Sequence, residues 1–220
     1  MATSAAPLGP DLGGTADRIL DVAERLVQTR GYHAFSYADV SEAVGIRKAG
    51  VHYHFPSKDD LGRAVAARYR ARFAEVLARL DATRKGPGAK LRAYAGLYEA
   101  VLADGLRACL CGMLAADFLT LPGAVRAEVA DFFADQEAWL ARVLAAGRAA
   151  GTLVFRGSPV REAQALLSGL EGALLVARAR AAPRTTAPPD GPLASPAEIG
   201  GAVRQFAAVA ERLIGALEQP

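Results

Sequence analysis

The chain has 220 residues, of which 52% are hydrophobic and 22% charged, a balance typical of a folded globular protein and not of a disordered one. Charged residues interrupt every apolar run before it reaches the ~20 residues that a membrane-spanning helix needs, so we expect no membrane partner. The first 14 residues lack the apolar core of an export signal and are expected to form a disordered tail. These features predict a cytoplasmic protein.

The net charge of +3 is unevenly placed along the chain. Residues 1–85 contain 13 Lys and Arg against 10 Asp and Glu, whereas residues 86–220 contain 13 of each. The whole excess therefore lies in the N-terminal part. An excess of this size is by itself only weak support for nucleic-acid binding.

Apolar residues recur at three- and four-residue steps almost throughout, which predicts an all-α fold of about nine helices. The first helix is expected to begin with Thr15 as its N-cap and to end at Gly31. The second opens at Ser36, with Asp39 at the position of a capping box, and ends at Gly45.

A third helix is expected from about Arg47 to Phe55, where Pro56 stops it. Two short helices joined across a glycine are typical of a helix-turn-helix motif. We therefore predict a helix-turn-helix domain over residues 15–60, in which Val40, Val44, Val51 and Phe55 form the core.

Ser57 is expected to cap a fourth helix that connects this domain to the rest of the chain over residues 61–85. The sequence Lys-Gly-Pro-Gly at 85–88 is the clearest domain boundary. A second domain over residues 86–220 is expected to contain helices at roughly 89–104, 108–120, 124–150, 158–181 and 195–218. The Pro-rich segment 182–195 is expected to be a mobile linker.

The last two predicted helices have regular apolar stripes that suit helix-helix packing. Such stripes in two helices per chain could build a four-helix dimer interface. The residues expected at that interface are Leu166, Leu170, Leu174, Val203, Phe206, Leu213 and Leu217. The alternative is that these stripes pack against the core of their own chain.

The stretch RKAGVHYHFPSK at 47–58 has the most unusual chemistry in the sequence. His52 and His54 lie about 200° apart around a helix axis, so they cannot share a metal ion, and His33 has no ligand cluster around it. No motif of a nucleophile and its base is present. We therefore expect no metal site, no cofactor and no catalytic residues, although distant residues can still assemble a catalytic site.

The same stretch suits the binding of a polyanion. Phosphate oxygens accept hydrogen bonds from Lys, Arg, Tyr, His and Ser side chains, and the second helix of a helix-turn-helix enters the major groove of DNA. Arg47 and Lys48 stand at the N-terminal end of that helix, where base edges are read. Tyr53, His54 and Lys58 stand near its exit, where phosphates flank the groove.

The segment GYHAFSYADVSEAVGIRKAGVHYHFPSKDDL resembles the DNA-binding signature of the TetR (tetracycline-repressor-like) family. The resemblance covers about 50 residues. It implies an all-helical homodimer whose N-terminal domains bind a palindromic double-stranded operator. The C-terminal domains would dimerise and enclose a pocket for a small-molecule inducer, and inducer binding would change the separation of the two recognition helices.

The resemblance also implies roles for single residues. Lys48 would approach bases or phosphates, Tyr53, His54 and Lys58 would hold the DNA backbone, and Ser36 would contact a phosphate while it caps its helix. The sequence departs from the family at four positions, which leaves the operator sequence open: Arg47, Ala49, Gly50 and His52.

The stretch CLCGMLAADFLTLP resembles a segment of one TetR subgroup, some of whose members respond to electrophiles or small acids through this region, and in which a cysteine can occupy the position of Cys109. A partly exposed Cys109 near Arg107 would be a reactive thiolate, whereas a buried one would simply be packing. The ligand pocket is expected to be lined by Tyr94, Tyr98, Cys109, Met113, Leu114, Phe118 and Trp139, although each of these could equally fill the core.

The sequence thus predicts a ligand-responsive repressor. Two other functions stay open at this point. One is a small-molecule-binding protein of the same architecture that has lost DNA binding, and the other is an all-α enzyme that uses the C-terminal cavity. Neither the inducer nor the target genes can be inferred from these residues.

Overall fold

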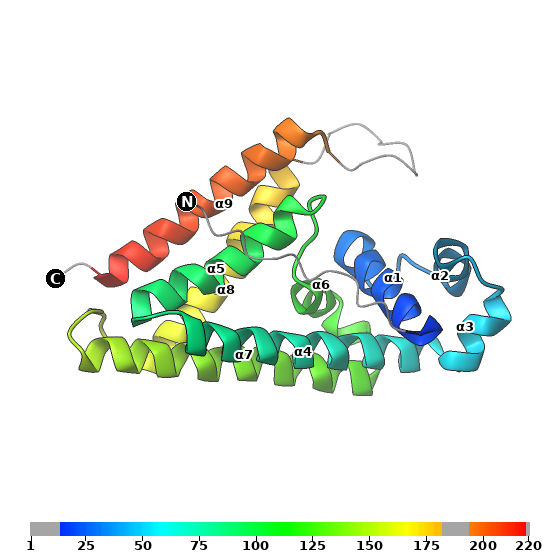
Figure 1. Cartoon of the computed structure of the whole chain (residues 1–220), viewed down its shortest axis with the longest axis horizontal. Helices are drawn as coiled ribbons and strands as arrows, with labels where there is room; N and C mark the ends of the chain where they lie inside the picture. The colour runs from blue at the N-terminus through cyan, green and yellow to red at the C-terminus, as the bar shows by residue number, and fades with distance from the viewer. Residues whose placement is uncertain (1–13, 182–193, 219–220) are drawn as a thin grey trace. The chain divides into compact units, whose positions relative to one another are not determined.

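The computed structural model describes residues 14–181 and 194–218. These residues form nine α-helices and one short 3-10 helix and contain no strand, which confirms the all-α prediction (Figure 1). The predicted tail, apart from Gly14, and residues 182–193 of the predicted linker lie outside the described residues. The elements are α1 (Thr15–Arg30), α2 (Tyr37–Val44), α3 (Lys48–His54), α4 (Lys58–Thr83), α5 (Pro87–Ala103), α6 (Leu110–Ala116), η1 (Phe118–Thr120), α7 (Gly123–Ala149), α8 (Pro159–Ala181) and α9 (Pro196–Glu218).

The helix ends follow local sequence signals. Ser36 and Asp39 form a complete capping box at α2, and Gly45 ends this helix in the left-handed conformation with φ of 75°. The first helix differs slightly from the prediction, because Gly14 occupies the N-cap position and Thr15 is the first helical residue. The predicted helix at 108–120 is divided into α6 and η1, with Cys109 at the N-cap of α6.

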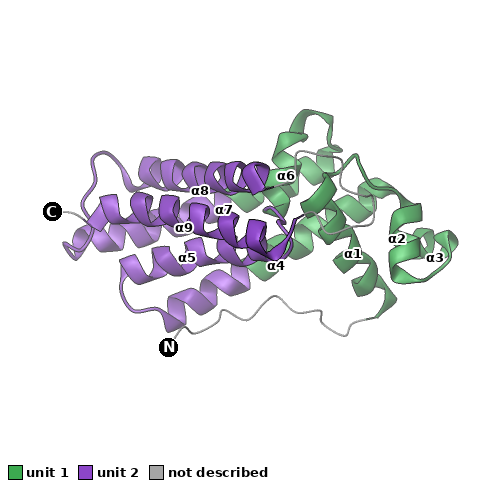
Figure 2. Cartoon of the chain, turned by 90° about the horizontal axis from the view of Figure 1, so that it is seen from above, with its two compact units in different colours: residues 1–73, 109–133 green, residues 74–108, 134–220 purple. Residues whose placement is uncertain are grey.

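The chain forms two compact units, and neither is a continuous segment (Figure 2). Unit 1 comprises residues 1–73 and 109–133, and unit 2 comprises residues 74–108 and 134–220. The chain thus leaves the helix-turn-helix unit in α4 and returns to it with α6, η1 and the first part of α7. The domains predicted from the sequence, at residues 15–60 and 86–220 with a connecting helix at 61–85, stay predictions.

Unit 1 has the predicted core with one correction. Val40, Val44 and Val51 are buried, as expected, but Phe55 is only half-buried. Between α1 and α4, the buried carboxylate of Glu24 pairs with Arg72 and lies 3.5 Å from the Nη2 of Arg68. Apolar packing and this ion-pair cluster together hold the first helix of unit 1 against α4.

In unit 2, α9 packs against both α8 and α5 (Figure 2). Five of the seven side chains expected at a dimer interface are buried inside this bundle of one chain: Leu166, Leu170, Leu174, Phe206 and Leu217. Leu213 also lies over α8 of its own chain, where a Cβ at Gly169 would be 2.9 Å from its Cδ1. A side chain with almost no exposed surface can bury little more against a partner, so the interface prediction is corrected for these five buried residues. Val203 and Leu213 are only half-buried, and their place at an interface stays a prediction.

Candidate DNA-binding site

The N-terminus of α2 is capped as predicted, but the cap uses the hydroxyl group that was expected to contact a phosphate. Ser36 Oγ lies 2.6 Å from Asp39 Oδ2 and 3.4 Å from the Asp39 amide. The hydroxyl hydrogen must go to the carboxylate, because a carboxylate oxygen only accepts. In this arrangement Ser36 has no hydrogen left to donate to a phosphate, and its observed role is that of a cap.

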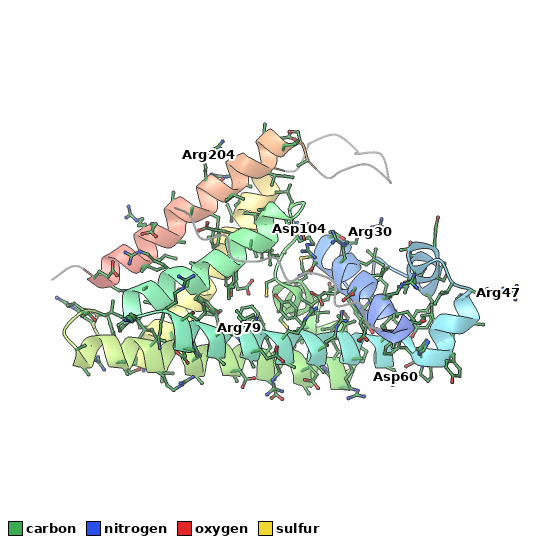
Figure 3. All side chains as sticks on the ribbon, viewed as in Figure 1. Arg30, Arg47, Asp60, Arg79, Asp104 and Arg204 are labelled. Carbon is green, nitrogen blue, oxygen red and sulfur yellow. The ribbon has the colours of Figure 1, made fainter. Side chains whose placement is uncertain are left out.

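The second helix of the motif, α3, exposes the chemistry expected of a DNA-reading surface. Arg47, Lys48 and Ala49 are exposed at its N-terminal end, and the Arg47 side chain points away from the ribbon (Figure 3). Tyr53 follows one turn later with 82% of its surface exposed, and the ring of the half-buried His54 makes an edge contact with it at 5.2 Å. Neither Arg47 nor Lys48 forms an ion pair within the described residues.

Two other predicted DNA-binding residues, Gly50 and the exposed His52, also make contacts within the protein. A Cβ at Gly50 would meet Ile46 Cδ1 at 3.4 Å, so this position faces the turn of the motif. The ring of His52 packs on that of Tyr37 at 4.6 Å, and its Nδ1 lies 3.2 Å from the carbonyl oxygen of Pro56. Because a carbonyl only accepts, Nδ1 must carry the hydrogen, and Nε2 is the ring nitrogen that remains for DNA.

Tyr37 was not singled out from the sequence, yet it holds the exit of the recognition helix. Its hydroxyl lies 2.8 Å from the carbonyl oxygen of Phe55 and 2.5 Å from that of Ser57. Burial, with the nearby Asp60 and Asp59, raises the pKa of Tyr37 to about 12, so the phenol stays protonated and can donate. An aromatic residue directly after a helix cap was the available signal in the sequence.

Lys58 is turned inward, away from the role that the resemblance implied. Its Nζ donates a hydrogen bond of 2.6 Å to the carbonyl oxygen of Phe35 and lies 4.5 Å and 4.9 Å from the ring centroids of Phe35 and Tyr32. Burial lowers the pKa of Lys58, against the opposing effect of Asp39 and Asp59. The ammonium therefore joins the start of α4 to the loop before α2, and the phosphate contact expected of Lys58 is not supported.

The residues predicted to line a ligand pocket are divided between the two units. Tyr94, Tyr98 and Trp139 belong to unit 2, where all three are buried. Cys109, Met113, Leu114 and Phe118 belong to unit 1. Cys109 and Cys111 are buried, and the Tyr69 hydroxyl lies 3.8 Å from Cys109 Sγ. The partly exposed Cys109 required of an electrophile sensor is therefore not observed.

A surface cavity of about 290 Å³ opens elsewhere in unit 2 and contains none of the seven predicted pocket residues. Its lining residues are Asp81, Gly86, Pro87, Lys90, Arg142, Val143 and Ala146. The Asp81 carboxylate already accepts hydrogen bonds from Lys90 Nζ at 2.6 Å and Trp139 Nε1 at 3.0 Å. These contacts lower the pKa of Asp81, and the charges that line the cavity are largely paired with each other.

An all-helical chain that presents an exposed basic and aromatic recognition helix in a helix-turn-helix is a DNA-binding protein. No helix among the described residues is long and apolar enough to span a membrane.

Comparisons with known proteins agree with this class. The family described as "Bacterial regulatory proteins, tetR family" matches residues 19–65, and "Tetracyclin repressor-like, C-terminal domain" matches residues 87–187. A TetR-family transcriptional regulator from Agrobacterium tumefaciens is 34% identical, with 93% of this chain and 98% of that chain covered and a TM-score of 0.79. The chain belongs to the TetR family and is a ligand-responsive, DNA-binding transcriptional regulator.

Two further proteins are informative. The transcriptional regulator AcuR of Cereibacter sphaeroides is 29% identical over 153 residues, which are 68% of this chain and 69% of AcuR. The structure of AibR in complex with isovaleryl coenzyme A and operator DNA is similar in fold, with 22% identity, a TM-score of 0.64 and coverage of 94% of this chain and 100% of that chain.

Proposed function

We propose that this regulator is a repressor that binds a palindromic operator as a homodimer in the cytoplasm and is released by a small molecule. The observation that carries the proposal is the pair Arg47 and Lys48, two exposed cations at the start of α3 without an acidic partner among the described residues. Cations in this position suit both base edges and phosphates. The AibR complex contains both operator DNA and a small molecule, which supports the proposal that this regulator binds both kinds of ligand.

Electrophoretic mobility shift with DNA from beside the gene of this protein tests the proposal. We expect a shift that weakens steeply as salt rises, because phosphate contacts release counterions. The Arg47→Ala variant should lose about tenfold in affinity for the best operator and should discriminate less at one base pair, since an arginine pairs with guanine through two hydrogen bonds. No shift at low salt would favour a ligand-binding protein without DNA binding, and an unchanged base preference would contradict the role of Arg47.

The homodimer needs a face other than the buried stripe, and α8 with α9 offers one. Leu175, Val176 and Val209 are among the few large apolar side chains that are exposed. Leu175 and Val176 lie on α8, where they continue a line of small exposed residues at three- and four-residue steps, namely Ala165, Ser168, Gly172 and Ala179. Small residues allow two helices to approach closely, so we propose that α8 and α9 pair with their copies through this face.

A charge placed on this face should separate the protomers. We expect Val176→Glu to convert the dimer into monomers, because a carboxylate would be buried without a partner. Val154→Glu is the matched control, since Val154 is 51% exposed and Val176 is 49% exposed but Val154 lies in the loop before α8. Sedimentation velocity measures both variants. A Val176→Glu protein that stays dimeric, or a Val154→Glu protein that dissociates, would place the interface elsewhere.

A further inference from the structure

The exposed face of α3 includes two rows of side chains. Lys48 and His52 lie one helical turn apart in the first row, and Ala49 and Tyr53 lie one turn apart in the second. All four residues are exposed, whereas Val51, on the inward side of the helix, is buried. His52 therefore belongs to the face of the recognition helix that is free to enter the major groove of DNA.

The ring of His52 is held in place by the segment that follows α3 and by α2. Its Nδ1 lies 3.2 Å from the carbonyl oxygen of Pro56, and the ring packs on that of Tyr37 with 4.6 Å between centroids and 55° between planes. The Tyr37 hydroxyl is in turn within hydrogen-bond distance of the carbonyl oxygens of Phe55 and Ser57. The His52 ring is therefore oriented before DNA binds, which reduces the side-chain entropy lost on binding.

The contact with Pro56 also determines the hydrogen-bonding character of the other ring nitrogen. A carbonyl oxygen only accepts, so Nδ1 of His52 donates to Pro56 and carries the hydrogen. In a neutral imidazole one nitrogen carries a hydrogen and the other is an acceptor. Nε2 of the neutral ring is therefore an acceptor, and it has no donor among the described residues.

We propose that Nε2 of His52 accepts a hydrogen bond from the exocyclic amino group of an operator base, which is N4 of cytosine or N6 of adenine. These amino groups are the donors in the major groove of B-DNA, whereas guanine and thymine present acceptors there. His52 thus reads the opposite kind of group from Arg47 and Lys48, which can only donate. The inference rests on the proposed function, in which α3 binds an operator, and adds the chemical group that one of its side chains recognises.

The first test needs no DNA. Nitrogen NMR of the isotope-labelled protein, at about pH 8 and so above the range in which histidine usually titrates, reports which ring nitrogen carries the hydrogen. We expect a protonated Nδ1 and an unprotonated Nε2 for His52, the reverse of the form that free histidine favours. The chain has three histidines, so a spectrum of His52→Phe assigns the signals and leaves His33 and His54 as internal references. A hydrogen on Nε2 of His52 would overturn the proposal.

The second test couples the side chain to one group of a base. DNA selected from a random pool by wild type and by His52→Phe should differ at one position of each half-site, because phenylalanine keeps the ring but has no acceptor. At that position the amino base is replaced by an analogue without the amino group, purine for adenine or pyrimidinone for cytosine. The loss of affinity should be roughly five- to tenfold larger for wild type than for His52→Phe. The weaker base pairing of the analogue affects both proteins and cancels in this comparison.

His54→Phe is the matched control, because it makes the same change two positions later on α3. This variant should lose as much affinity as wild type when the amino group is removed. Selected DNA that is the same for wild type and His52→Phe would overturn the proposal. So would a coupling of His52 to the carbonyl oxygen of guanine or thymine, which would make His52 a donor. Failure of the proposed function would appear separately, as the absence of a mobility shift with every protein, and the NMR result does not depend on DNA.

Discussion

Replacing Phe206 by alanine is expected to lower the free energy of unfolding by about 3 to 5 kcal/mol, the usual cost of truncating a fully buried aromatic side chain. Phe206 has no exposed surface and stacks on Tyr98, so its loss leaves a cavity between α5 and α9 of one chain. Chemical denaturation at two protein concentrations measures the effect, and the difference from wild type should be the same at both.

This result distinguishes a Phe206 side chain in the core of one chain from a Phe206 side chain in the dimer interface, where the sequence placed it. If Phe206 lay between two protomers, its truncation would mainly weaken association, and the difference would change with protein concentration. Val209→Ala is the matched control on the same helix, because Val209 is exposed. In a protein kept monomeric by Val176→Glu, Val209→Ala should change stability by less than about 0.5 kcal/mol, and a larger loss would mean that Val209 also belongs to the core.

Lys58→Met is expected to lower the free energy of unfolding by about 2 kcal/mol and to leave the salt dependence of operator binding unchanged. The methionine keeps the apolar stem but loses the charged donor to the Phe35 carbonyl and the contacts with two aromatic rings. Since the ammonium is already committed inside unit 1, no phosphate contact is lost. Chemical denaturation and mobility shifts at four salt concentrations measure the two quantities.

Lys48→Met provides the opposite result in the same experiment. Lys48 is exposed, so the free energy of unfolding of the Lys48→Met variant should equal that of wild type. The slope of log affinity against log salt should become shallower by about 0.9 if Lys48 neutralises one phosphate. A Lys58→Met protein that is as stable as wild type and has a shallower slope would show that Lys58 contacts a phosphate after all. The two lysines thus distinguish a residue that positions the recognition helix from one that touches DNA.

The helix boundaries were largely predictable because their signals are local. The Ser36 and Asp39 box, the glycine at 45 and the pairing of Ser57 with Asp60 each lie within a few residues of the end that they define. The DNA-binding class was predictable for the same reason, since its residues form one continuous stretch of sequence.

The remaining features depend on contacts between distant residues. The acceptor for Lys58 is a backbone carbonyl 23 residues away, and a long side chain at an exposed-looking position gives no sign of turning inward. The stripe of Phe206 and Leu170 has the same periodicity whether it meets a neighbouring helix of its own chain or a second protomer.

The discontinuity of unit 1 has a consequence for the modularity of this regulator. Within that unit, Tyr69 packs its ring against Phe132 at 5.5 Å, His33 Nε2 lies 2.9 Å from Thr120 Oγ1, and Arg70 Nη1 pairs with Asp131 at 2.7 Å. All three partners on the second segment come after the Gly-Pro-Gly that looks like a boundary in the sequence. A chimera joined at that point would bring a foreign α6 and α7 against the native α1 and α4. We therefore expect operator specificity to be transferable only together with residues 109–133, as a two-segment graft.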